Sequence, residues 1–431
     1  MTTETQKLDA LISLKLSRGE FIEALSIVQS KKSSNQHQEF INHLSEVSKF
    51  LRELFLDHNK IREAKSLRKE FWKKIKGKRI GFVDGGVASL DLPSSAPVGI
   101  RVGTYSVEVG DRTENREEFD FKSTIVDELY GDKARTFVDS FEDIQKLADA
   151  ARIISELSGA VKLSNEAKVP DLIMLHGPLI NPVAPYGTPG FPSFSEQQAN
   201  ELFPNTAKDY SDEKNSHFVT LYRELIESFD NNKCPCFGVI ERSATRKPQV
   251  IYSHLESLKN DGYITSETIS DIADIIDTYL LTDTMLLSLI LEEYEWIEPI
   301  NIDVQQPENK WPDGWRSEIR RYPSALTTYV KSSIESDPFR VQLSENQVFE
   351  DWHAELLINT SILLPAYNFP VGLDIVDKHA KVPSWMSKSI RGQHATVLMM
   401  KALETGNPEA VSYAKRIMAA KGRDWMFRPG A

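Results

Sequence analysis

The chain has 431 residues, of which 40% are hydrophobic and 26% charged, with 21 glycines and 21 prolines. This composition is typical of a folded globular chain and excludes a collagen-like, coiled-coil or wholly disordered protein; the length fits about three domains, or one elaborated domain with terminal helices. The formal net charge of −12 disfavours a protein that coats nucleic acid with its whole surface, but it allows a local basic channel.

No segment has the pattern of a secretory signal or a membrane span. Residues 1–16 are polar with helical periodicity, and they lack a long apolar run before a small-residue cleavage site. The longest clean apolar stretch, Thr284–Leu291, is far shorter than the roughly 20 residues that a membrane helix needs. We therefore expect a cytoplasmic protein without a membrane partner.

The first 78 residues predict helices. The last of these, from Lys60 to Arg79, contains ten Lys or Arg residues, and its apolar residues recur at helical spacing. This pattern predicts an amphipathic helix with one packed face and one cationic face. The cationic face is either a solvated surface or a contact for phosphates or an acidic partner.

Extended segments follow at residue 79. Ile80–Val83 predicts a short strand that ends at Asp84, and Gly85 and Gly86 predict a tight turn after it. Residues 98–109 alternate apolar and polar side chains, and Arg116–Phe121 is a further extended run. Successive runs of this kind predict an antiparallel meander.

A change of period marks the next two elements. Residues 141–157 have the spacing of an amphipathic helix, and Leu172–His176 is a continuous apolar run typical of a buried parallel strand. Strand, strand, strand, helix, strand is the opening order of a ribonuclease H-like sheet. We predict an α/β fold: a ribonuclease H-like mixed sheet flanked by helices, with N- and C-terminal helical additions, and boundaries at 1–78, 79–392 and 393–431.

The remaining pattern alternates helices and strands. We predict strands at 236–241, 325–331, 339–343 and 355–363, and helices at 216–229, 248–259, 267–293, 370–381, 393–405 and 408–420.

Three residues are candidates for chemistry at the rim of this sheet. Asp84 ends the first strand, and His176 ends the strand that we expect beside it, so their side chains should converge. Glu156 lies among apolar residues near the end of the intervening helix, where an acid can point inward. The alternatives are a turn-capping Asp84 and a solvated Glu156.

Basic residues near other strand ends are candidates for holding phosphate oxygens, with a solvated surface as the alternative. They are Arg242, Arg246, Lys247, Lys331 and Arg340.

Several of these segments together resemble the NurA nuclease family, in order and over roughly residues 78 to 400. The resemblance is carried by Phe82–Gly86, the helix with Arg152 and Glu156, Leu172–Leu179, Leu281–Asp283, Phe339–Leu343, and Phe369–Pro370 with the downstream Asp377. It implies a ribonuclease H-like, manganese-dependent DNA nuclease that acts, usually as a dimer, with the hexameric translocase HerA in DNA end processing; bacterial relatives also occur in anti-phage defence.

Carried over by position, the resemblance makes Asp84, Glu156, His176 and Asp377 the catalytic and metal-binding residues. His176 is a departure, because the family typically has an Asp there. Imidazole suits Mn²⁺ better than Mg²⁺ and removes one negative charge. Three outcomes stay open: a Mn²⁺-preferring nuclease, a one-metal nuclease, or an inactive member that serves as a DNA-binding adaptor of the translocase.

Overall fold

The computed structural model describes most of the chain and divides by its internal contacts into two units. The first unit comprises Met1–Arg62 and Thr245–Leu291, and the second comprises Glu63–Ala244 and Glu292–Ala431. The described residues are 4–31, 34–89, 98–126, 141–181, 193–202, 208–232, 234–241, 247–302, 315–364 and 367–420.

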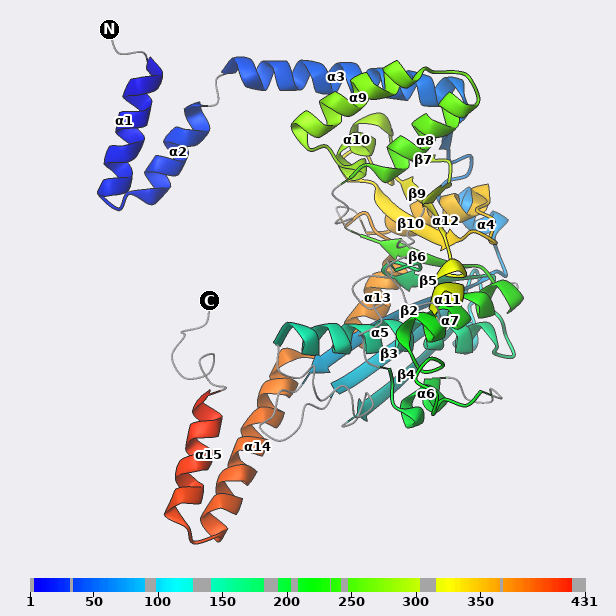
Figure 1. Cartoon of the computed structure of the whole chain (residues 1–431). Coiled ribbons are helices and arrows are strands. Elements are labelled where there is room, and N and C mark those ends of the chain that lie inside the picture. Colours follow the sequence, from blue (N-terminus) through cyan, green and yellow to red (C-terminus); the bar gives the residue numbers. More distant parts are fainter. Residues whose placement is uncertain are drawn as a thin grey trace. The chain divides into compact units, whose positions relative to one another are not determined.

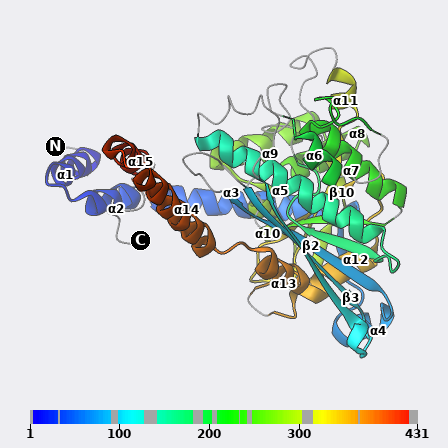
Figure 2. The same cartoon turned by 90° about the horizontal axis from the view of Figure 1, so that it is seen from below.

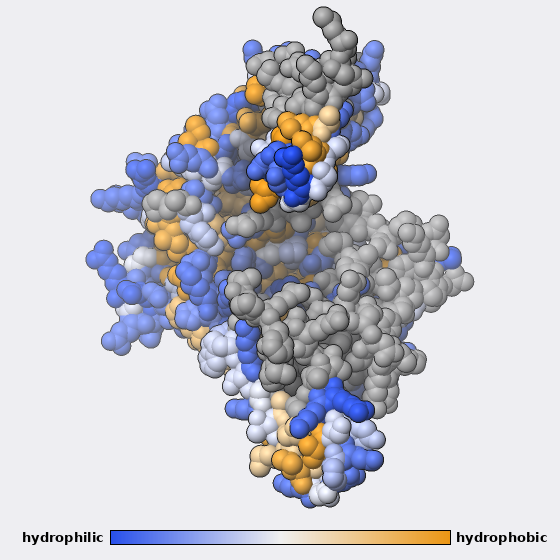
Figure 3. Space-filling view, turned by 90° about the vertical axis from the view of Figure 1, so that its left-hand side faces the viewer, coloured by the Kyte–Doolittle hydropathy of each residue, from blue (hydrophilic) through white to orange (hydrophobic). Residues whose placement is uncertain are grey.

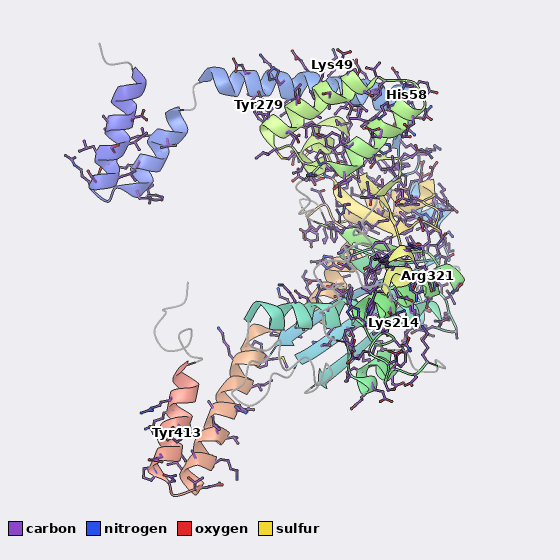
Figure 4. The ribbon with its side chains drawn as sticks, in the orientation of Figure 1. Lys49, His58, Lys214, Tyr279, Arg321 and Tyr413 are labelled. Atoms are coloured by element: carbon purple, nitrogen blue, oxygen red, sulfur yellow. The ribbon has the colours of Figure 1, made fainter. Side chains whose placement is uncertain are left out.

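The described part of the first unit is helical. Its helices are α1 (Glu4–Ser17), α2 (Phe21–Lys31), α3 (Ser34–Asp57), α8 (Gln249–Asn260), α9 (Ser266–Tyr279) and α10 (Asp283–Ile290). The hydroxyl of Tyr279, labelled in Figure 4, lies 2.9 Å from His43 Nδ1 and so joins α9 to α3. The predicted single helix 267–293 is wrong, because Leu280 adopts a left-handed conformation (φ 52°) and ends α9.

The second unit is built on a ten-stranded mixed sheet, in the order β1-β7-β9-β10-β6-β5-β2-β3-β4, with β8 paired to β9. β2–β3 and β3–β4 are antiparallel, whereas β2–β5 and β5–β6 are parallel. This arrangement confirms the predicted ribonuclease H-like order. The strands are β1 (Ile61–Glu63), β2 (Arg79–Ser89), β3 (Val98–Glu108), β4 (Glu117–Val126), β5 (Leu172–His176), β6 (Cys236–Ile240), β7 (Glu295–Ile297), β8 (Ile300–Ile302), β9 (Ala325–Val330) and β10 (Phe339–Ser344).

Helices cover both faces of the central strands. Figure 2 shows β2 and β3 between α5 (Phe141–Ser164) and α13 (Val371–Ala380). Because successive side chains of a strand point to opposite faces, β2 contributes to two separate cores. Val83 packs in the core of α5 and α7 (Phe218–Asn232), and Phe82 packs in the core of α12 (Asp351–Ser361) and α13.

Six further elements belong to the described part of the second unit. They are α4 (Arg68–Lys74), a 3₁₀ turn at Glu114–Arg116, α6 (Glu196–Leu202), α11 (Arg316–Arg320), α14 (Ser384–Glu404) and α15 (Pro408–Ala420), which Figure 1 shows in chain order by colour.

The predicted helix from Lys60 to Arg79 is wrong over most of its length. The segment holds the strand β1, the short helix α4 and the first residue of β2. Between β1 and α4, the buried carboxylate of Glu355 accepts hydrogen bonds from the backbone N–H groups of Lys65 and Ser66, at 3.2 and 3.1 Å. These bonds join residues almost 300 positions apart in the chain and take the place of local helical hydrogen bonds. The helical spacing of the apolar residues in this segment therefore did not determine its structure.

The predicted strand at 355–363 is also wrong, because these residues belong mostly to the helix α12. Every α12 residue from His353 to Ser361 is buried. A helix that is buried all round has no polar stripe, and its sequence cannot be distinguished from that of a buried strand by period alone.

The α14–α15 hairpin carries apolar side chains that its own two helices do not cover. Figure 3 shows hydrophobic residues on this hairpin at the bottom of the view. The exposed ones include Trp385, Val397, Met400, Leu403 and Tyr413, each more than half exposed. Among the described residues, no helix is both long and apolar enough to cross a membrane.

Candidate metal centre

Asp84 lies inside β2 rather than at its end. The strand continues to Ser89, so the predicted tight turn at Gly85 and Gly86 is wrong. The parallel pairing of β2 with β5 stops one residue earlier, at Val83 and Leu175. The Asp84 carboxylate is 5% exposed, and its Oδ1 accepts a hydrogen bond of 2.8 Å from the N–H of Gly85.

His176 is the last residue of β5 and meets Asp84 as predicted. Its Nδ1 lies 3.1 Å from Asp84 Oδ2, and its ring lies 5.6 Å from the ring of Phe369. The next residue, Gly177, has φ +120°, a conformation that side chains disfavour, and it lets the chain turn away immediately after the histidine.

Asp377 reaches the same place from α13. This helix approaches β2 closely because each element has a glycine at the contact, Gly86 in β2 and Gly372 in α13. A Cβ at Gly86 would lie 2.2 Å from the carbonyl oxygen of Ala380, and one at Gly372 would lie 2.3 Å from the ring of Phe82. One potential ligand atom from each of Asp84, His176 and Asp377 then lies within 4.8 Å of the others. We call these three residues the triad.

Glu156 does not join the triad. It lies on α5, against the opposite face of β2, where a Cβ at Gly85 would come within 2.5 Å of its Cγ. The carboxylate is 4% exposed, and its Oε1 accepts a hydrogen bond of 2.6 Å from Arg152 Nη1. The pKa of Glu156 is raised to about 7, because burial, with a smaller contribution from the charge of Asp84, outweighs the lowering effect of Arg152. Glu156 is thus an inward-pointing acid, as predicted; it pairs with Arg152, the charges of Asp84 and His176 also act on it, and its role as a metal ligand stays a prediction.

The groups of the triad influence one another electrostatically. Burial lowers the pKa of His176, but the hydrogen bond to Asp84 and the charges of Asp84 and Asp377 outweigh it, so the pKa lies above its ordinary value. Burial and the neighbouring charge of Asp84 raise the pKa of Asp377. Both raised pKa values favour the protonated forms of His176 and Asp377 beside Asp84, and a bound cation would compete with these protons.

The triad fits a divalent transition metal. Two carboxylates and one imidazole form a mixed oxygen and nitrogen donor set, which Mn²⁺ accepts and Mg²⁺ accepts poorly. The donors come from three different elements of a close-packed core, so they are held in place without a metal.

The predicted phosphate-binding residues are distributed differently. Arg242 and Arg246 lie outside the described residues, and Lys247 is an exposed residue of the first unit. Lys331 follows β9 and Arg340 is the second residue of β10. The antiparallel pairing of β10 with β6, and of β9 with β10, brings both residues to the sheet edge of Asp84 and His176. There Lys331 is 4% exposed and Arg340 is half-buried.

Sequence reasoning missed the role of the glycines around Asp84. We interpreted Gly85 and Gly86 as turn residues, but they are strand residues that let α5 and α13 approach the two faces of β2. Two consecutive glycines inside an otherwise apolar strand were the available signal, since glycine in a strand often marks a close approach of another backbone.

Comparisons with known proteins found one matching family and several similar solved structures. The profile of the NurA domain family matches residues 78–382. The NurA nuclease structure from Sulfolobus solfataricus is 14% identical and has a TM-score of 0.48, with 93% of this chain and 99% of that chain covered. A structure of NurA with manganese is 11% identical with a TM-score of 0.41, covering 86% and 98%. Human ENDOV is 11% identical with a TM-score of 0.29, covering 78% and 94%. No curated protein matches significantly.

Proposed function

The chain belongs to the NurA family, and we propose that it is a divalent-metal-dependent nuclease that hydrolyses phosphodiester bonds of DNA at the triad. One observation carries the proposal: Asp84, His176 and Asp377, from β2, β5 and α13, place ligand atoms within 4.8 Å of one another. When bound, a divalent cation lowers the pKa of a water molecule and compensates charge on the phosphate oxygens.

The side chains of the triad have separate tasks in this proposal. The carboxylates of Asp84 and Asp377 supply negative charge, and His176 supplies a neutral nitrogen once it has released its proton. Since Nδ1 is hydrogen-bonded to Asp84, this proton release and cation binding are coupled. Across the strand, the charge of Arg152 holds Glu156 in place beneath Gly85.

We propose Mn²⁺ as the metal, with Mg²⁺ as the weaker alternative. The reason is the imidazole of His176, because a nitrogen donor is acceptable to Mn²⁺, whereas Mg²⁺ prefers oxygen. Cleavage supported by Mn²⁺ should therefore exceed cleavage supported by Mg²⁺ at equal concentration.

The second candidate function is a DNA-binding adaptor without catalysis. It is favoured by the hydrogen bond of 3.1 Å between His176 and Asp84, which satisfies both groups without a metal. Calorimetric titration with Mn²⁺ separates the two functions: an adaptor gives no binding that Asp84→Asn abolishes.

We also propose that the chain acts as a homodimer with a HerA-type hexameric translocase in DNA end processing or anti-phage defence. The family resemblance suggests this partner, and the sequence lacks the Gly-x-x-x-x-Gly-Lys-Ser/Thr phosphate loop of an ATPase. Co-expression with such a translocase, followed by size-exclusion chromatography, tests it: separate elution of the two proteins would contradict the partnership.

The decisive experiment measures DNA cleavage by the purified chain. Linear duplex and single-stranded DNA are incubated with Mn²⁺, with Mg²⁺ or with EDTA, for the wild type, Asp84→Asn and the control Asp111→Asn, which changes the β3–β4 connection. We expect cleavage by the wild type and the control in Mn²⁺ only, or in Mn²⁺ above Mg²⁺. If wild type and Asp84→Asn give the same result, the proposal fails.

A further inference from the structure

Two phenylalanines of β4 are exposed although they lie beside the triad. The side chains of Phe119 and Phe121 are 44% and 39% exposed. Exposed aromatic residues on adjacent rungs of one strand expose apolar surface to water without packing in return, which is a common property of binding surfaces.

The strand register places Phe121 on the rung of the triad. Asp84 pairs with Gly103 of β3, and Gly103 pairs with Phe121. Paired residues share a face, and neighbouring strands are about 4.8 Å apart, so Phe121 lies on the face of Asp84 at a distance of two strands, or about 10 Å. Gly103 between them makes room for α13 and for the ring of Phe121, because a Cβ at Gly103 would lie 3.3 Å from Val376 Cγ2 and 3.5 Å from Phe121 Cε1.

An aromatic and cationic group surrounds these two rings. Phe119 stacks on Tyr105 at 4.4 Å between ring centroids, and His379 of α13 lies 5.3 Å from Phe119 and 5.5 Å from Phe121. The guanidinium of Arg101 lies 4.8 Å from the centre of the Phe121 ring.

Arg101 has no acidic partner in the described part of the chain. Its recorded contact there is with the ring of Phe121, and its Nε is buried without a hydrogen-bond partner among those residues. A buried guanidinium nitrogen without a partner is costly unless a ligand or a residue outside the described part satisfies it. Arg101 is therefore a cation available to an incoming anion.

Two of the three acids of β4, Glu118 and Asp120, lie on the other face, whereas Glu117, at the start of the strand, shares the face of Phe119 and pairs with Arg116 at 2.9 Å. Glu118 pairs with Arg79, and Asp120 lies 3.3 Å from Lys162 of α5. The alternation of β4 thus places Glu118 and Asp120 away from the phenyl rings, and the register places Glu117 four residues from Phe121, at the end of β4 farther from the triad. On the face of the triad, the two phenyl rings of β4 and the guanidinium of Arg101 of β3 together form an aromatic and cationic group that suits unpaired bases joined by phosphates.

We propose that Arg101, Phe119, Phe121 and His379 form a stacking platform that holds single-stranded DNA as it approaches the triad. Bases stack on the exposed rings, and Arg101 binds a backbone phosphate. A base within a duplex does not offer its face, so the platform selects unpaired strands. The inference rests on the proposed function only in taking DNA as the substrate, and it assigns the polynucleotide contact to residues outside the metal-binding group.

The test measures binding in the absence of cleavage. The full chain in EDTA is titrated into a fluorescein-labelled oligothymidylate or a blunt duplex of equal length, and anisotropy is recorded. Phe121→Ala should weaken single-strand binding at least about five-fold, the lower limit for a lost base–aromatic stack. Phe121→Trp should preserve it, and Tyr413→Ala, which removes an exposed ring of α15 (Figure 4), should leave it unchanged.

Arg101 is tested in the same assay. Arg101→Ala should weaken single-strand binding and reduce the slope of log affinity against log salt by about 0.7, as expected for one lost phosphate contact. Arg101→Lys should retain that slope. The matched control is Arg112→Ala, which removes an exposed arginine in the connection between β3 and β4.

The results of these assays test the platform and the proposed nuclease separately. Unchanged single-strand binding by Phe121→Ala and Arg101→Ala, with native melting temperatures, overturns the platform, as does an equal loss for duplex and single strand. Platform-dependent binding by a chain that never cleaves DNA would uphold the inference and contradict the proposed nuclease. DNA cleavage with a normal KM in the Phe121→Ala and Arg101→Ala variants would uphold the proposed nuclease and contradict the platform.

Discussion

The two faces of β2 at the candidate centre have opposite electrostatic designs. On the α13 face, Asp84 meets His176 and Asp377, and no Lys or Arg is bonded to Asp84 or Asp377 among the described residues. On the α5 face, Glu156 is more deeply enclosed and is paired with Arg152 at 2.6 Å. The α13 face therefore holds groups that can bind a cation, whereas on the α5 face the guanidinium of Arg152 already pairs with the acid.

The comparison teaches that sequence neighbours can have different roles. Asp84 and Gly85 are adjacent, yet Asp84 belongs to the triad and Gly85 makes room for Glu156. If the distinction is right, changes on the α13 face should abolish metal-dependent activity, and changes on the α5 face should act through stability and position.

The largest effect is expected from Asp377→Asn. The amide cannot supply the charge that a divalent cation needs, and metal chemistry contributes several kcal/mol, so DNA cleavage should fall by about 10³-fold. The control is Asp374→Asn on the same helix, which removes a partner of Lys378. The initial rate of DNA cleavage in Mn²⁺ is measured for both variants. Equal rates would show that Asp377 does not hold the metal.

The pH dependence of stability tests the α5 face. The pKa of Glu156 is raised by burial from 4.5 to about 7. As pH rises through 4.5 the unfolded chain releases this proton while the folded chain keeps it, so stability falls between about pH 4.5 and 7. The loss is on the order of 3 kcal/mol and complete above about pH 7.

Glu156→Gln should lack this part of the pH dependence, whereas Glu345→Gln, an exposed control, should retain it. Urea unfolding in EDTA at about pH 5 and about pH 8 measures the difference. The same slope in wild type and Glu156→Gln would show that Glu156 is ionised in the metal-free protein at low pH.

Gly85→Ala should disturb the α5 face without touching a triad side chain. The new Cβ would lie 2.5 Å from Glu156 Cγ, so we expect a destabilisation of about 1–3 kcal/mol from overpacking. Cleavage should fall by up to about 10²-fold as β2 shifts beside Asp84. Gly99→Ala is the control, because its new Cβ would lie 3.7 Å from the carbonyl oxygen of Ala88, an ordinary van der Waals distance. The melting temperature and the rate of DNA cleavage are measured for both variants. Equal values for Gly85→Ala and Gly99→Ala would show that close packing at Gly85 is not required.

The smallest effect is expected from His176→Asp. Replacing nitrogen by oxygen should raise the ratio of Mg²⁺-supported to Mn²⁺-supported cleavage by about ten-fold, the size of effect that one altered group near a metal gives. The ratio of the two rates in one preparation serves as its own control. An unchanged ratio would mean that His176 does not contact the metal.

The order of the elements around the site could be predicted, because β2, β5 and α5 have clear periodicity in the sequence. Asp84 and His176 could be paired for the same reason, since parallel strands bring their ends to one edge. Asp377 was reached through the family resemblance. Glu156 was predicted to point inward, but its separation from the triad depends on which face of β2 covers it.

The sequence by itself determined the strand order at the centre, the junction of Asp84 with His176 and the alternation of β4, because these follow from the local period of side chains along each element. Only the tertiary structure decided the rest. It assigned Glu156 to the face opposite Asp377, replaced the predicted helix at Lys60–Arg79 through hydrogen bonds from Glu355, and joined residues 245–291 to the N-terminal helices. These features depend on contacts between residues far apart in the chain, and no local pattern encodes which distant partner satisfies a buried group.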